Sequence, residues 1–129
     1  MSAMRALYID GEWVETDDSI DNINPSDTTD SLGRYAQATP ALADQAINSA
    51  NRAAVEWGQS PMETRYQVLM AIGNELIDRS AELGELLARE EGKTRAEGVG
   101  EVFRSGQFFH YFAAEVHRQI DDRVDSVRP

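Results

Sequence analysis

The sequence of 129 residues contains no cysteine. Disulfide bridges, thiolate-bound metals and catalysis by a cysteine nucleophile within these residues are therefore excluded. The sequence also has no apolar run near the roughly 20 residues that a membrane-spanning helix needs. Its first residues carry one arginine and no sustained apolar stretch, unlike a secretory signal peptide. We therefore expect a cytoplasmic location.

Basic side chains are scarce, because 12 of them stand against 23 acidic ones, for a formal net charge of −11. Such a surface repels nucleic acid and anionic membranes, so neither is an expected partner. Lys93 is the only lysine. This composition fits a halophilic protein, adapted to salt that screens charges over about 3 Å at 1 M. It fits equally a genome whose base composition favours arginine codons.

Apolar residues make up 41% of the sequence, which favours a folded core over disorder. The pattern predicts an α+β segment with a β-rich part over residues 6–38, a helical part over 39–119 and a polar tail over 120–129. Asp10-Gly11 lies between β-prone residues, the strongest short signal for a β-hairpin. We expect a loop over residues 17–21. A further short strand is expected over 33–38.

Capping residues divide the helical part into three or four amphipathic helices. Thr39 is expected to cap the first helix, and Gly58 to end it. Ser60 to Glu63 has the form of a capping box. It opens a long apolar pattern that fits either one helix or two, with Ser80 starting the second.

Gly92 is expected to end that pattern. Thr94 to Glu97 forms another capping box, which opens the last helix. Gly92-Lys93-Thr94 also matches the end of a phosphate-binding P-loop, but the glycine that this motif needs earlier is Leu87. Gly98 and Gly100 do not complete a dinucleotide fingerprint, because its third glycine position holds Phe103. We expect both glycines to be close-packing positions within a helix.

His110 and His117 are too few for a metal site, which needs three or four ligands, and are expected at the surface. Five aromatic residues gather between positions 103 and 112. Few cations are interleaved with them, so stacking on nucleic acid is disfavoured. These aromatic side chains are expected to pack against structure that is not part of the chain.

Six segments in order resemble the aldehyde dehydrogenase superfamily over residues 6–129. They are the strand pair Tyr8 to Trp13, the Asn24-Pro25 turn, the alanine-rich helix over 41–57, the Arg65-x-x-x-Leu69 motif, Glu90-Glu91-Gly92-Lys93 and the aromatic stretch 109–114. Glu91 stands where the family's Glu-Thr-Gly-Lys signature has threonine. No single segment is specific, but their order and spacing together identify the resemblance.

The resemblance implies that this is the amino-terminal segment only, forming the outer part of the cofactor domain of an α/β fold. The family's enzymes use a cysteine thiolate and NAD or NADP to oxidise an aldehyde to a carboxylic acid. Their catalytic and cofactor-binding residues match no position here, so the chain alone is expected to be inactive and to bind no cofactor. The implied partner is the remainder of the enzyme, which is expected to be a homo-oligomer.

The resemblance also implies site residues. Gly100 and Arg104 match positions that face the family's substrate tunnel, where Arg104 would attract an acidic aldehyde such as an oxo-acid semialdehyde. The alternative is an exposed Arg104 that pairs with Glu101 or Glu97. Asn22, Ile23 and Glu90 match residues that hold a monovalent cation in some family members.

A second function class stays open on the sequence alone. The segment could be a stand-alone acidic helical interaction module that kept these helices and lost the enzyme. Its apolar helix faces would then have to find another partner.

Overall fold

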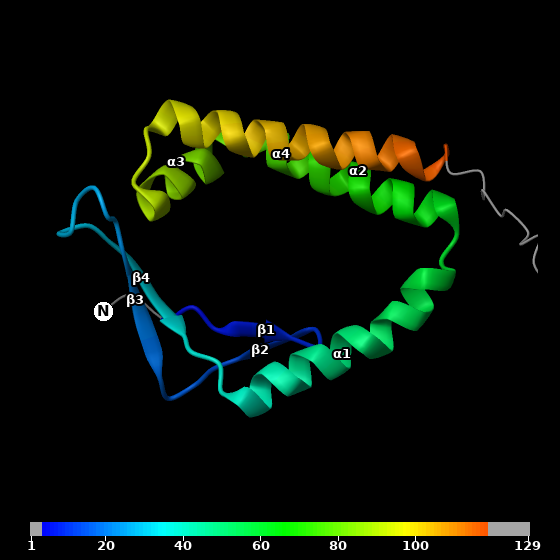
Figure 1. Cartoon of the computed structure of the whole chain (residues 1–129). Coiled ribbons are helices and arrows are strands. Elements are labelled where there is room, and N and C mark those ends of the chain that lie inside the picture. Colours follow the sequence, from blue (N-terminus) through cyan, green and yellow to red (C-terminus); the bar gives the residue numbers. More distant parts are fainter. Residues whose placement is uncertain (1–3, 119–129) are drawn as a thin grey trace, which may run out of the picture.

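A computed structural model of the chain describes residues 4–118. Two antiparallel strand pairs precede four helices, which confirms the predicted α+β order. The elements are β1 (Leu7–Ile9), β2 (Glu12–Val14), β3 (Ser19–Ile23), β4 (Ser31–Ala36), α1 (Pro40–Gln59), α2 (Met62–Asp78), α3 (Ser80–Glu91) and α4 (Arg95–Val116). Figure 1 shows them arranged in a ring, with α2 and α4 along the top and α1 below. The predicted tail over 120–129 lies outside the described residues.

The first hairpin forms where the sequence predicts it. Asp10 and Gly11 occupy its turn with φ values of 56° and 83°, which few residues other than glycine, asparagine and aspartate adopt. Tyr8 pairs with Trp13 across β1 and β2. Their rings lie 4.9 Å apart, so this small sheet is closed by an aromatic contact on an exposed face.

The second hairpin corrects one prediction and adjusts another. Residues 17–21, expected to be a loop, include the start of β3, where Ile20 pairs with Tyr35 of β4. This strand is largely exposed, so its sequence lacks the alternating apolar pattern that reveals a half-buried strand. The strand expected over 33–38 is found at Ser31–Ala36.

Three predicted helix ends are confirmed. The Thr39 side chain accepts the Leu42 backbone N–H and caps α1. Gly92 ends α3 in the left-handed region, with φ of 75°. Thr94 caps α4 in a complete capping box with Glu97.

Two predicted helix boundaries are wrong, for one physical reason. Gly58 does not end α1, which continues to Gln59. Ser60 does not cap α2, because the cap position is Pro61 and the Ser60 hydroxyl donates to the carbonyl oxygen of Trp57 instead. The residue before a proline is driven into an extended conformation, so Pro61 sets this break.

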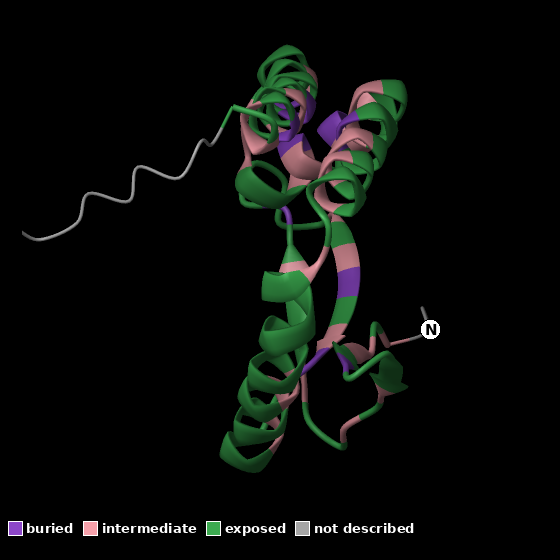
Figure 2. Ribbon diagram, turned by 90° about the vertical axis from the view of Figure 1, so that its right-hand side faces the viewer, coloured by how far each residue is buried: buried purple, intermediate pink, exposed green. Residues whose placement is uncertain are grey.

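The long apolar pattern after Pro61 is two helices, α2 and α3. The break lies at Arg79, and Ser80 is the first residue of α3 without acting as a side-chain cap. α4 then packs along both of them. Figure 2 shows buried positions gathered between these three helices.

Glycines set how closely the helices approach one another. A Cβ added at Gly98 would lie 2.3 Å from the carbonyl oxygen of Gly84, so α3 and α4 are in backbone contact there. A Cβ at Gly106 would lie 2.8 Å from the carbonyl oxygen of Gly73, which joins α4 to α2 in the same way. The prediction of close packing is confirmed for Gly98. It is wrong for Gly100, around whose Cβ position no atom of residues 4–118 beyond its own helix backbone lies within 4 Å.

α1 stands apart from this bundle. None of its 20 residues is buried, and Figure 2 shows it exposed along its length. Asp10 of the first turn holds it, by accepting hydrogen bonds from Ser49 at 2.6 Å and Arg52 at 2.8 Å. Among residues 4–118, none of the helices has the length and apolar character required to cross a bilayer.

Candidate functional site

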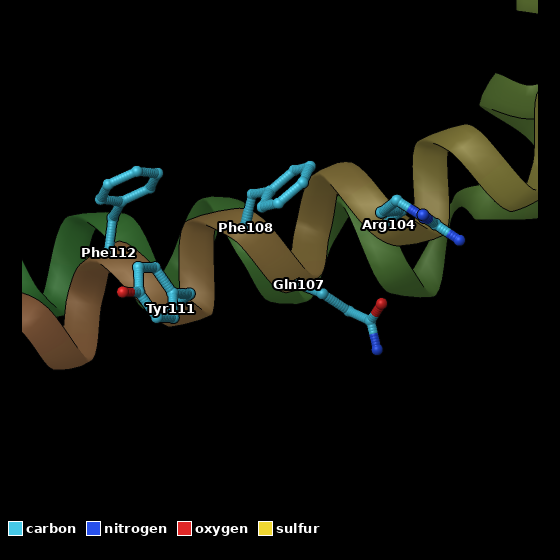
Figure 3. Close-up of a pocket in the computed structure, with 5 residues that line it drawn as sticks. All are labelled: Arg104, Gln107, Phe108, Tyr111 and Phe112. Atoms are coloured by element: carbon cyan, nitrogen blue, oxygen red, sulfur yellow. The ribbon is translucent and has the colours of Figure 1, made fainter.

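The exposed face of α4 carries an open pocket of about 470 Å³. Three aromatic side chains line it, and each is more than half exposed: Phe108 at 57%, Tyr111 at 56% and Phe112 at 58%. Residues three and four apart lie on one face of a helix, which is why this stretch gathers its rings on one side. Figure 3 shows Arg104 at one end of the pocket and Phe112 at the other. The surface therefore offers apolar rings beside one guanidinium group.

A second, more polar hollow of about 310 Å³ adjoins the first. It is lined by Glu97, Gly100, Glu101 and Arg104, so Arg104 belongs to both hollows. Gly100 contributes no side chain, which leaves open space one helical turn before Arg104. The structure thus brings Gly100 and Arg104, the two residues predicted to face a substrate, together on one exposed surface.

The alternative prediction was an exposed Arg104 paired with Glu101 or Glu97; Arg104 is exposed, but the ion pair is not formed in this structure. Glu97 accepts hydrogen bonds from the Thr94 hydroxyl and backbone N–H, which lower the pKa of its carboxyl group. Glu101 accepts a 2.6 Å hydrogen bond from Lys93, and its carboxylate with that of Glu91 raises the pKa of Lys93. Both acids are thus engaged elsewhere. With residues 4–118, Arg104 forms no ion pair.

The residues predicted to hold a monovalent cation lie where the carboxyl end of α3 meets β3. The Asn22 side-chain amide donates a 2.8 Å hydrogen bond to Glu90. Ile23 follows Asn22, at the irregularity where the register of β3 and β4 shifts. The structure therefore brings Asn22 and Glu90 into contact across 68 positions of sequence. In the described part of the chain, no cluster of three or more histidine and acidic side chains could hold a metal ion.

The two histidines, His110 and His117, differ in their exposure to solvent. His117 is exposed, as predicted, with its ring 4.8 Å from that of Tyr66. His110 is half-buried, which corrects the prediction. Its ring lies over Gly73, and its Nε2 is 2.9 Å from Oδ1 of Asn74. His110 therefore packs in the crossing of α2 and α4.

One contact set was not predicted from the sequence. The loop between β3 and β4 reaches the carboxyl end of α3, where Arg89 donates two hydrogen bonds to Asp30, at 2.8 and 2.6 Å. The Asn24 side chain donates to the same carboxylate at 3.1 Å. The Ser26 hydroxyl donates to the carbonyl oxygen of Gly92 at 2.9 Å. No local pattern signals pairs 59 and 66 residues apart, so only the folded structure reveals them.

Comparison with known proteins gives a consistent result. A sequence model described as the aldehyde dehydrogenase family matches residues 13–128. Alpha-ketoglutarate semialdehyde dehydrogenase of Haloferax volcanii is 36% identical over 110 residues, which are 84% of this chain and 23% of that protein.

Two solved structures share the fold. Lactaldehyde dehydrogenase from Escherichia coli matches with a TM-score of 0.87 and 29% identity, over 98% of this chain and 27% of that one. Betaine aldehyde dehydrogenase from Staphylococcus aureus, in complex with NAD+, matches with a TM-score of 0.86 and 31% identity, over 97% and 26% of the two chains. The present chain therefore spans about a quarter of the length of these three proteins.

Proposed function

Because this chain belongs to the aldehyde dehydrogenase family, we propose that it is the amino-terminal part of an NAD(P)-dependent aldehyde dehydrogenase. The complete enzyme would oxidise an aldehyde to a carboxylic acid and pass a hydride to NAD or NADP. The family match over residues 13–128 carries this proposal. The likeness to a betaine aldehyde dehydrogenase solved with NAD+ supports it. In this account the partner of the segment is the rest of a homo-oligomeric enzyme.

We propose further that these 129 residues do not catalyse on their own. The reaction implied by the family begins with a cysteine thiolate, and the sequence contains no cysteine. The purified chain should therefore give no aldehyde-dependent reduction of NAD or NADP, measured by the absorbance of the reduced nicotinamide. Clear turnover would contradict this assignment.

The coding DNA after the codon for Pro129 distinguishes an enzyme segment from a stand-alone interaction module. An enzyme segment should continue, in frame or after one frameshift, into a cofactor-binding core and a cysteine motif. If an unrelated gene or a long spacer follows instead, the stand-alone acidic helical module becomes the better explanation.

For the substrate, we propose an aldehyde that carries a carboxylate, such as an oxo-acid semialdehyde. The support is the exposed guanidinium of Arg104 beside the aromatic rings and the side-chain-free Gly100. The acids nearest to it on α4 are bound to other groups. The Haloferax volcanii relative is an alpha-ketoglutarate semialdehyde dehydrogenase, whose name describes such a substrate.

Substitution of Arg104 in the complete enzyme tests the substrate class. Arg104→Gln removes a charge-assisted hydrogen bond worth about 1.5–3 kcal/mol, so KM for an acidic semialdehyde should rise roughly tenfold to a hundredfold. KM for an uncharged aldehyde of similar length should change little. Arg95→Gln is the matched control, because Arg95 lies on the same helix and pairs with Glu85. Equal effects on both aldehydes would contradict a carboxylate contact.

We also propose that Asn22, Ile23 and Glu90 form a monovalent-cation site. The 2.8 Å contact of Asn22 with Glu90 supports it, because it places a carboxylate beside two carbonyl-bearing residues of β3. Sodium bound by the chain should broaden the ²³Na nuclear magnetic resonance signal, and Glu90→Gln should reduce this broadening. Equal broadening by the parent and by Glu90→Gln would contradict the site.

The acidic surface supports one more proposal, which is that the protein works in a cytoplasm of high salt concentration. Its formal net charge is −11, with a single lysine. Self-repulsion of this size destabilises a compact state unless salt screens it.

A further inference from the structure

The ring of elements is closed at two separate places. On one side the chain itself runs from α1 into α2 through Ser60 and Pro61. On the other side the β3–β4 loop meets the α3–α4 turn, as Figure 1 shows. Within residues 4–118, every hydrogen bond between the strands and helices α2–α4 is made at this second place.

We propose that this second contact is a latch, which ties the strands and α1 to the helical bundle and can open while both parts stay folded. The latch consists of Asn22, Ser26 and Asp30 on the strand side and Arg89, Glu90 and Gly92 on the helix side. The ion pair between Asp30 and Arg89 is the main interaction that holds the latch closed. This inference does not depend on the proposed enzymatic function.

The strand side of the latch is organised by its own hydrogen bonds. Asn24 is buried, and its side-chain oxygen accepts the Ser26 backbone N–H while its nitrogen donates to Asp30. The backbone N–H of Asn24 donates to the carbonyl oxygen of Asp30 at 3.0 Å. Thr29 is bound to Asp27 within the same loop. Since these bonds do not involve the helices, the loop keeps its shape when the latch is open.

The helix side is also complete without the strands. Gly92 closes α3 by donating its backbone N–H to the carbonyl oxygen of Ala88 at 2.9 Å. Next to it, Thr94 and Glu97 close the capping box of α4. The α3–α4 turn is therefore held by bonds of its own, and it does not need the loop in order to form.

The contact between the two sides is closely fitted but small. A Cβ at Gly92 would lie 2.7 Å from Pro25, so the surfaces touch with no room for a side chain. The charged pair is partly open to water, with 29% of the Asp30 side chain and 38% of the Arg89 side chain exposed. Water and salt weaken such an ion pair, so it can break and re-form more easily than the contacts of a buried core.

Spin labels on introduced cysteines test the latch in the 129-residue chain, whose sequence has no cysteine to interfere. Thr28→Cys and Ala96→Cys place one exposed label on each side. Pulsed electron paramagnetic resonance then gives the distribution of distances between them. In the parent it should be narrow. Asp30→Asn should broaden it towards longer distances while the helix content from circular dichroism stays unchanged.

Three further variants make the result decisive. Arg89→Gln removes the same ion pair from the helix side and leaves the hydrogen bond of Asn24 to Asp30 in place, so it should broaden the distribution as Asp30→Asn does. Arg79→Met breaks an exposed ion pair of similar kind with Glu75 and Glu82 inside the bundle, and should leave the distribution unchanged. If Asp30→Asn loses helix content, Ser26→Ala replaces it, since it removes one hydrogen bond without changing a charge and should broaden the distribution partly.

The proposal of a latch is overturned if Asp30→Asn keeps its helix content and its distance distribution matches that of the parent. It is also overturned if Arg79→Met broadens the distribution as much as Asp30→Asn does. Where Ser26→Ala takes the place of Asp30→Asn, an unchanged distribution in that variant overturns the inference.

Discussion

At the scale of single residues, Thr94 caps the start of α4 in a capping box with Glu97. Its hydroxyl accepts the Glu97 backbone N–H and donates to the Glu97 carboxylate. Thr94→Ala should therefore lower the free energy of unfolding by about 1 kcal/mol, measured by urea denaturation. Thr64→Ala, an exposed threonine inside α2, should change it by less than about 0.5 kcal/mol. Equal losses would show that the capping box does not stabilise this helix.

Asp30 should make stability depend on acid. Hydrogen bonds from Arg89 and then Asn24 lower its pKa from 3.8 to about 2. A carboxyl group whose pKa is lowered by folding contributes stability above its unfolded pKa, and loses it as the pH falls through the folded value. The destabilisation caused by Asp30→Asn should thus be nearly full above about pH 5 and shrink as the pH falls through the folded pKa of about 2. Urea denaturation at several pH values measures it, and a pH-independent difference would contradict the linkage.

At the scale of elements, chemical signals in the sequence predict helix ends better than helix contacts. Thr39, Gly92 and Thr94 were predictable because a cap acts within four residues of itself. The error at Ser60 arose because two local rules competed there, and the proline prevailed over the capping box. The approach of Gly84 to Gly98 was not predictable in detail, since a glycine contact depends on which helices meet.

Two glycines of α4 should respond to alanine with opposite signs. Gly98→Ala places a Cβ 2.3 Å from the carbonyl oxygen of Gly84, so α3 and α4 must separate, at a net cost of roughly 1–2 kcal/mol. Gly100→Ala meets open space and gains helix propensity, so it should stabilise the chain by up to about 1 kcal/mol. Thermal unfolding of the two variants beside the parent checks this. Destabilisation by both would mean that Gly100 is also a packing position.

At the scale of the whole molecule, the order of elements was predictable, and so was the gathering of Gly100 and Arg104 on one helix face. A helical period places residues four apart on the same side. The ring shape was not predictable, because it depends on contacts between residues far apart in sequence, such as Asp30 with Arg89. The exposed rings of Phe108 and Phe112 agree with the expectation of an apolar face left without a partner in these residues.

The acidic surface should make folding dependent on salt. Raising KCl from about 0.1 M to 1 M shortens the screening length from about 10 Å to 3 Å, so repulsion among the acids weakens and the thermal midpoint should rise by several degrees. Asp44→Lys with Glu56→Lys, at two exposed acids of α1, should reduce this rise because the variant repels itself less. A thermal midpoint that does not change with salt would contradict a charge-driven effect. The same rise in the parent and in the double variant would also contradict it.

The isolation of α1 determines where the chain can be cut. A protease cleaves chain that is locally unfolded, so it attacks helices that unwind at a low free-energy cost. α1 has no buried side chain, and Arg52 lies in the middle of it, held by one exposed carboxylate. Trypsin should therefore cleave after Arg52 before it reaches Arg79 or Arg89, and leave α2, α3 and α4 as a resistant core joined through their glycine contacts.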